Sequence, residues 1–262
     1  MRISRKSARI ALLILPLAAT ARSETGGEVD PQESSSRGTT YGFELDTRSQ
    51  YLFRGLPFTE GPVSQIAGWV ATRGFTFFAW GNFLLERELR QQGFSETNFG
   101  ASYERQWKNL TLRPGFVTYF YHAPSHLEAE PTSEGSLTAM YTIGAVDVFT
   151  QQVVDVGSAR GAYYGEAGVS LDRSLGGALA IAGTLSCDFA SARYNQAVFG
   201  LEHRGFNQVG LEISVTWAPS ERVYFRPHFE LARTLDSDLR RRLGRSAVAA
   251  FGLAIAFERS GK

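Results

Sequence analysis

AFGLAIAF, residues 250–257, alternates strictly between large and small side chains. The large ones are Phe251, Leu253, Ile255 and Phe257, and the small ones are Ala250, Gly252, Ala254 and Ala256. Side chains alternate faces along a strand, so one face is wholly apolar and the other has almost no bulk. A half-buried strand of a soluble sheet normally carries polar residues on its second face. The small face therefore indicates a crowded interior or a channel wall, and the apolar face requires a protein core or a lipid bilayer.

Alternating segments recur along the chain, each about ten residues long, which is the length that a tilted strand needs to cross a bilayer. About twelve can be counted, and single-chain bacterial barrels have an even number of strands. They begin near Thr40, Pro62, Phe75, Phe94, Leu110, Gly135, Val146, Gly161, Gly177, Asn207, Arg222 and Ser246. Short and long connectors alternate between them, as in outer-membrane barrels whose short turns lie in the periplasm. The sequence therefore predicts an all-β fold, a transmembrane antiparallel up-and-down β-barrel over residues 40–257.

Three features complicate or limit this pattern. Pro114 and Pro227 fall within predicted strands, where proline removes a ladder donor, so we expect a bulge at each. Tyr194–His203 alternates weakly and is compatible with either a further strand or a loop. Residues 258–262 follow the last strand as a short tail.

The N-terminal residues 1–21 have the features of an export signal. A basic segment precedes the apolar stretch Ile10–Ala19, which is too short to span a bilayer as a helix. Small residues favour cleavage after Ala21, with Ser23 as the alternative. Residues 22–39 are polar and are expected to form a disordered periplasmic tether. Cys187 is the single cysteine, so no internal disulfide can form.

Composition favours a membrane barrel over the alternatives. The net charge of +1 gives no reason to expect nucleic-acid binding, whereas 19 Phe and 10 Tyr suit a barrel with aromatic girdles. The predicted strands place apolar residues on one face and Glu, Asp, Arg, Ser and Gly on the other. A secreted β-sandwich or lipocalin-like barrel is the alternative, and it would need a polar outer face. We therefore expect lipid contact at Phe251, Leu253, Ile255 and Phe257, in the bacterial outer membrane.

The predicted inward face carries most of the strand charges, because exposure of charge to lipid is costly. The lumen-lining residues expected from the alternation are Glu44, Asp46, Arg48, Glu104, Arg113, Glu166, Glu212, Arg226, His228 and Glu230. Three further carboxylates share this face, namely Asp147, Asp155 and Asp188. Because carboxylates outnumber arginines, we expect some ion pairs and a residual negative field that mildly favours cations.

The first predicted strand ends in the motif Ser49-x-Tyr51-x-Phe53-Arg54-Gly55. A proline, a second strand and an aromatic strand with Trp80 and Asn82 follow it. Over residues 49–84 the sequence resembles the TorF-type porins, a family of outer-membrane barrels. It departs from their pattern at Gln50, where an acidic residue is usual, and at LPFTEG, where a more polar run is usual. The resemblance implies the fold and the location, and a porin-like role by association.

Two roles are open for the Arg54-Gly55 pair at the end of this motif. Arg54 can form a constriction or anchor a loop. Alternatively, Gly55 simply allows a tight turn and Arg54 pairs with a nearby carboxylate such as Glu60 or Glu86.

For function, we expect a small diffusion channel for hydrophilic solutes or ions. Two alternatives are an outer-membrane enzyme acting on lipid or lipopolysaccharide, and a structural or interaction barrel with a plugged lumen. A count of twelve strands lies between filled and open barrels and does not decide. No Gly-x-Ser-x-Gly or nucleotide-binding motif occurs, so we predict no enzyme, cofactor or metal site.

The expected partners follow from the surface and from the last strand. They are outer-membrane lipid, lipopolysaccharide and the barrel-assembly machinery, whose C-terminal signal the last strand resembles; nucleic acid is not among them. Arg240–Arg242 offer a site for lipopolysaccharide phosphates, or they pair with Asp236 and Asp238 within their own loop.

Overall fold

The computed structural model describes residues 38–59, 61–85, 94–122 and 130–261. The predicted export signal and residues 22–37 of the predicted tether lie outside these ranges, so both stay predictions. Glu60 and Glu86, the local partners considered for Arg54, also lie outside them.

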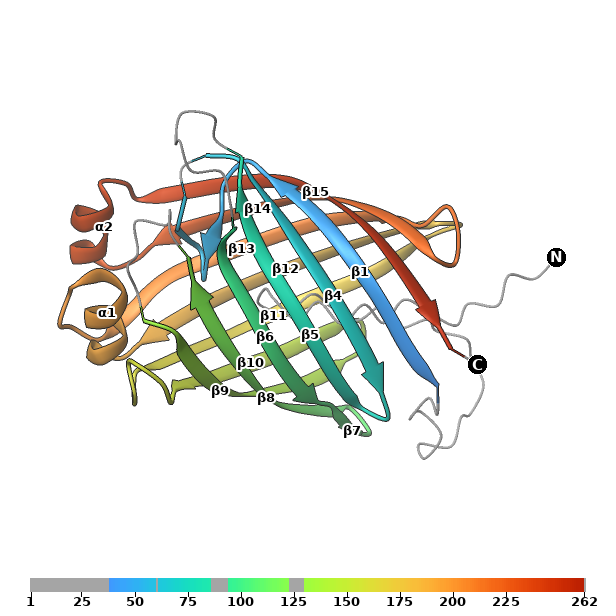
Figure 1. Ribbon diagram of the computed structural model, residues 1–262, viewed down its shortest axis with the longest axis horizontal. Helices are drawn as coiled ribbons and strands as arrows, with labels where there is room; N and C mark the ends of the chain where they lie inside the picture. The colour runs from blue at the N-terminus through green and yellow to red at the C-terminus, as the bar shows by residue number, and fades with distance from the viewer. Residues whose placement is uncertain (1–37, 60, 86–93, 123–129, 262) are drawn as a thin grey trace.

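Twelve long antiparallel strands form a closed barrel (Figure 1). Their bounds are β1 Thr39–Arg48, β4 Val63–Thr72, β5 Phe75–Leu84, β6 Phe94–Tyr103, β8 Leu110–Tyr121, β9 Thr132–Ile143, β10 Val146–Asp155, β11 Tyr163–Gly176, β12 Leu179–Ala190, β13 Gly205–Trp217, β14 Val223–Thr234 and β15 Ala247–Ser260. Each strand pairs with its neighbour in sequence, and β1 pairs with β15 to close the ring. The short β7, Arg105–Trp107, continues β6 along β8 in the same register. The predicted barrel is confirmed, and every strand begins within three residues of its predicted start.

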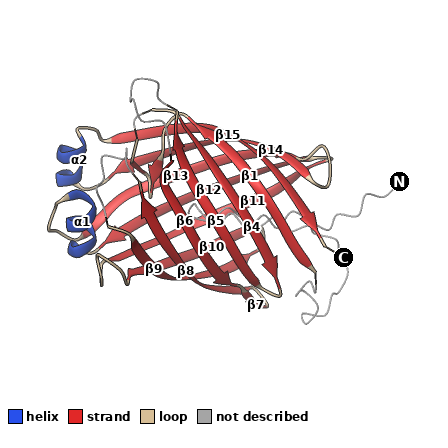
Figure 2. Ribbon diagram, in the orientation of Figure 1, coloured by secondary structure: helices blue, strands red, loops and turns tan. Residues whose placement is uncertain are grey.

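The two ends of the barrel differ. Short turns and the barrel's first and last residues lie at one end, and the longer connectors lie at the other (Figure 1). These connectors include α1, Ala192–Phe199, and α2, Ser237–Leu243, drawn in blue in Figure 2. They also include the small hairpin of β2, Leu52–Phe53, and β3, Leu56–Pro57, which forms a sheet of its own. Neither helix is long and apolar enough to cross a membrane, nor is any other helix within the described ranges.

The segment Tyr194–His203, left open between strand and loop, contains most of α1. Ser191 begins the helix, since its hydroxyl accepts a hydrogen bond from the Tyr194 backbone N–H. Gly200 ends it in the left-handed conformation, with φ 70°. The weak alternation therefore reflects a capped helix, and the rest of the segment has no regular structure.

The prediction of a bulge at each of the two prolines is wrong. Pro114 pairs with Leu137, and Pro227 pairs with Leu253, both in continuous register. Each proline instead lies opposite a break in the ladder on its other side, between β6 and β7 and between Ser214 and Trp217 of β13. Because proline lacks only its N–H, the strand loses hydrogen bonds there without gaining a residue.

Large apolar side chains cover the outer surface of the barrel. On β15, Phe251, Leu253 and Ile255 are 68%, 46% and 42% exposed, whereas Ala254 is completely buried. Phe257 is half-buried because its ring stacks on Phe43 of β1, with centroids 6.0 Å apart. Exposed residues of the same kind occur on the other long strands, for example Ile66, Phe77, Phe99, Leu137, Val148, Leu185 and Ile213.

We predict that arginine at Ile213 destabilises the barrel far more than arginine at the next residue, Ser214. Ile213 is exposed on the outer surface of β13, and Ser214 is the cross-strand partner of His228 on the inner side. Arginine on a lipid-facing site near the bilayer centre costs about 2–4 kcal/mol. Denaturant titration of both variants, folded in lipid vesicles, measures the difference in free energy of unfolding. Equal losses would show that the outer face does not contact lipid.

Candidate functional site

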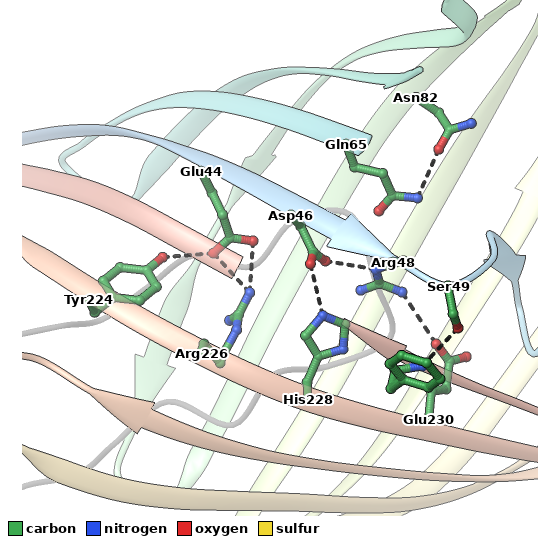
Figure 3. A network of polar contacts seen from close by, with 11 residues as sticks. Glu44, Asp46, Arg48, Ser49, Gln65, Asn82, Tyr224, Arg226, His228 and Glu230 are labelled. Atoms are coloured by element: carbon green, nitrogen blue, oxygen red, sulfur yellow. Dashed lines mark hydrogen bonds and ion pairs between the residues drawn. The ribbon is translucent and has the colours of Figure 1, made fainter. Parts of the chain in front are cut away.

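The inner face of β15 is small because polar side chains from its two neighbours meet above it. In register, Glu44 of β1 lies beside Ala256 of β15, which lies beside Tyr224 of β14. Glu44 accepts two hydrogen bonds from Arg226 Nη2, at 2.7 and 2.8 Å, and a third from the Tyr224 hydroxyl at 2.9 Å (Figure 3). A larger residue at position 256 would occupy the space that these contacts cross.

A second group of ion pairs continues this network toward the long-loop end. Asp46 lies 2.9 Å from His228 Nε2 and accepts a hydrogen bond of 2.7 Å from Arg48 Nε (Figure 3). Arg48 also reaches Glu230 at 3.4 Å. Gly252 lies beneath these contacts, and a Cβ added there would lie 2.5 Å from His228 Nε2. The small face of β15 and the charged faces of β1 and β14 therefore depend on each other.

Among the described residues, the other expected lumen residues form no ion pair with this network. Glu104, between β6 and β7, and Arg113 of β8 form their own ion pair. Glu166 is buried on β11 and lies directly opposite Asp188 of β12. Glu212 is directly opposite Glu230. Opposed carboxylates repel each other, so the wall formed by β11–β13 concentrates negative charge.

Two buried carboxylates, Glu96 of β6 and Glu134 of β9, were missed in the sequence. Each lies at the long-loop end of its strand, where the alternation is short. Glu134 falls just before the predicted start of its strand at Gly135, within the predicted loop. Both face the hairpin of β2 and β3, which local periodicity could not reveal.

The β2–β3 hairpin, in blue near the long-loop end in Figure 1, folds back from β1 into the barrel. Leu52 is completely buried and packs with Ala232, Val248 and Ala250 of β14 and β15. On another side, Tyr51 packs in a cluster with Val63, Trp80 and Leu84, and its hydroxyl donates to Glu96 at 3.2 Å. The ring of Phe53 meets Tyr119 of β8 edge-on, with centroids 6.1 Å apart. These contacts span the lumen from β15 to β8.

Arg54, at the tip of the hairpin, reaches the far wall. Its Nη2 donates to Glu134 at 2.5 Å, and its Nη1 donates to the Tyr194 hydroxyl of α1 at 3.1 Å. The backbone carbonyl of Arg54 accepts a hydrogen bond from the Gln208 side chain of β13. Gly55 is packed so closely against Gln208 that an added Cβ would overlap the side-chain amide. Both roles considered for the pair find support here, because Gly55 allows a tight turn with a φ of +68° and Arg54 pairs with a carboxylate, which is the distant Glu134.

Two other predicted groups have defined places. Ser49 follows β1, and its hydroxyl accepts a hydrogen bond from the Phe251 N–H at 3.2 Å, which fastens the start of the motif to β15 (Figure 3). In α2, Arg241 pairs with Asp238, and Arg240 donates to the backbone carbonyl of Leu235 at 2.9 Å. Arg240 and Arg241 are thus engaged within their own loop. Among the described residues, no cluster of three or more His, Cys, Asp or Glu side chains could hold a metal ion.

A closed twelve-stranded antiparallel barrel with an apolar exterior and a charged interior defines the class of transmembrane β-barrels. Two solved structures of this class resemble the chain. The NanC porin superposes with a TM-score of 0.54 at 8% identity, over 83% of this chain and 98% of that chain. The KdgM porin superposes with a TM-score of 0.52 at 9% identity, over 82% of this chain and 98% of that chain. At these identities the likeness establishes the fold.

The sequence comparisons add no family assignment. No protein-family profile matches the chain, and no curated protein sequence matches it significantly. The resemblance to the TorF-type porins therefore stays an inference from residues 49–84.

We predict that Gly55→Ala loosens the hairpin. Gly55 has a φ of +68°, and alanine in this left-handed conformation costs about 1–2 kcal/mol before its overlap with Gln208 is counted. Hydrogen exchange of residues 52–57 should become faster. Gly144→Ala is the matched control, since Gly144 has a φ of +62° in a turn with open space around it. Unchanged protection of the hairpin in Gly55→Ala would contradict the packing described here.

Proposed function

We propose that the protein is a bacterial outer-membrane diffusion channel for small hydrophilic solutes or ions, related to the TorF-type porins. The single observation that supports this best is the division of side chains, with apolar residues outside the barrel and ionisable residues inside it. The exterior of a soluble barrel faces water and does not carry so large an apolar surface. An interior packed as an apolar core does not accommodate so many charged side chains, because burying charge is costly. The likeness to porin structures agrees with this proposal, and we propose no enzymatic activity.

The proposed lipid-facing surface includes Phe251, Leu253, Ile255 and Phe257. Lipid and lipopolysaccharide contact this exterior, and the barrel-assembly machinery inserts the chain through its last strand. The folded protein should then stay with the membrane until detergent is added, and it should migrate faster on gels before heating than after. Recovery of a folded monomer from the periplasm without detergent would overturn the proposal.

We propose that the lumen mildly prefers cations. Its carboxylates include Glu44, Asp46, Glu96, Glu104, Glu134, Asp147, Asp155, Glu166, Asp188, Glu212 and Glu230, and its arginines include Arg48, Arg54, Arg113 and Arg226. Ion pairs engage all four arginines. The excess of carboxylates lies within a low-dielectric wall, which concentrates counter-ions.

The double variant Glu166→Gln with Glu212→Gln tests this preference. Among the described residues, neither carboxylate takes part in an ion pair, so their replacement removes two acidic groups without freeing an arginine. In a planar bilayer under a salt gradient, the reversal potential should indicate cation preference for the native protein. It should move toward anions in the double variant, and both effects should weaken at high salt.

Glu221→Gln is the matched control, because Glu221 is exposed in a short turn outside the lumen. It should leave the reversal potential almost unchanged. Anion preference in the native protein, or an equal shift in the control, would contradict the assigned lumen field.

The plugged barrel is the second candidate, and the β2–β3 hairpin is the observation that favours it. The hairpin makes contacts from β15 to Glu134 of β9, so it narrows the lumen. A steady current step in the same bilayer experiment supports the channel. Silence in the native protein together with conduction in Gly55→Ala would support a plug.

A further inference from the structure

The Arg54 guanidinium is enclosed by aromatic rings. Its central carbon lies 4.3 Å from the ring centroid of Tyr164, 4.7 Å from that of Phe53 and 5.4 Å from that of Tyr194. Its nitrogens donate to the Glu134 carboxylate and to the Tyr194 hydroxyl. Tyr119 donates to the same Glu134 oxygen at 2.7 Å and so orients the carboxylate.

Most of this enclosure belongs to the barrel and not to the hairpin. Glu134 comes from β9, Tyr164 from β11, Tyr194 from α1 and Tyr119 from β8. We call these four residues the cation cage. The Tyr164 hydroxyl is itself held by Asp188 at 2.9 Å, so the ring is fixed independently of Arg54. The hairpin in turn has anchors elsewhere, at Leu52 and Tyr51.

The chemistry of the cage matches one class of cation. Aromatic faces attract cations through their quadrupole. The carboxylate and the hydroxyl accept from two different nitrogens, which the planar fork of a guanidinium supplies and a single ammonium nitrogen does not. A buried carboxylate without a counter-charge is also costly, so a cation beside Glu134 stabilises this part of the lumen.

We propose that the cation cage is a binding site for the guanidinium group of a solute, and that Arg54 is its intramolecular occupant. A solute guanidinium that takes the place of Arg54 frees the tip of the hairpin. This binding site requires the folded barrel but does not require that the barrel conducts ions. It can therefore be tested separately from the proposed channel. Because Arg54 is tethered, it competes at an effective concentration of about millimolar or more, and native affinity for a free guanidinium is correspondingly reduced.

The test replaces the occupant and supplies the ligand from solution. Arg54 has a φ of +49°, a conformation that asparagine tolerates, so Arg54→Asn removes the guanidinium with little change in backbone preference. The full-length variant and the native protein, both folded in detergent, are titrated with methylguanidinium, and binding is followed by saturation-transfer NMR of the ligand. Binding to Arg54→Asn should be at least about tenfold tighter than to the native protein. Hydrogen exchange of residues 52–57 should be fast in the variant, and methylguanidinium should not slow it.

Two controls make the result decisive. Methylammonium carries the same charge without the planar fork, and the double variant Arg54→Asn with Glu134→Gln lacks the carboxylate. Both should lose most of the binding. Equal binding of methylammonium, full binding to the double variant, or no binding to Arg54→Asn would each overturn the proposal.

Folding is checked by heat-dependent migration on gels, and Arg54→Gly replaces Arg54→Asn if the latter does not fold. If the protein binds methylguanidinium in detergent but passes no current in bilayers, the proposed guanidinium site stands and the proposed channel is wrong. If the protein conducts but does not bind methylguanidinium, the proposed channel stands and the proposed guanidinium site is wrong.

Discussion

The ion pairs that cross above β15 are the constraint on which the barrel closure depends. A barrel closes when its first and last strands pair, and here β1 joins β15 along nine residue pairs. Glu44 and Asp46 of β1 reach past β15 to Arg226 and His228 of β14. This is possible only because the inner face of the last strand carries alanine and glycine. The seam is thus stabilised by backbone hydrogen bonds between adjacent strands and by side-chain contacts across three strands.

The interior has two walls of different electrostatic character. On the side of β1 and β14, carboxylates are interleaved with Arg48 and Arg226, and most of the charge is neutralised. From β9 to β13 the carboxylates outnumber the cations. Arg54 of the hairpin adds a positive charge to this wall through its ion pair with Glu134. The hairpin therefore narrows the lumen sterically, and its arginine also lowers the negative potential of the acidic wall.

Much of the fold could be predicted from the sequence, because each strand repeats the same contrast between its two faces. Phe75, Phe94, Leu110 and Val146 begin strands where the alternation placed them. The site was less accessible. The motif around Arg54 was recognised, but its partner was sought among nearby acids, whereas Glu134 lies 80 residues away. The sequence pattern did not identify helix α1, because a helix of 8 residues is too short to show a clear helical periodicity.

The β2–β3 hairpin precedes, in the sequence, most of the strands that it contacts. Arg54 bonds to residues 80, 140 and 154 positions further along the chain, on β9, α1 and β13. Such distant contacts carry the entropy of closing long loops and form after local pairs do. Because Leu52 also packs against β14 and β15, the hairpin can take its final place only when all twelve long strands have assembled around it. Its seating is therefore a late event in folding, and a chain truncated before β13 would lack the hydrogen bond from Gln208 to the Arg54 carbonyl.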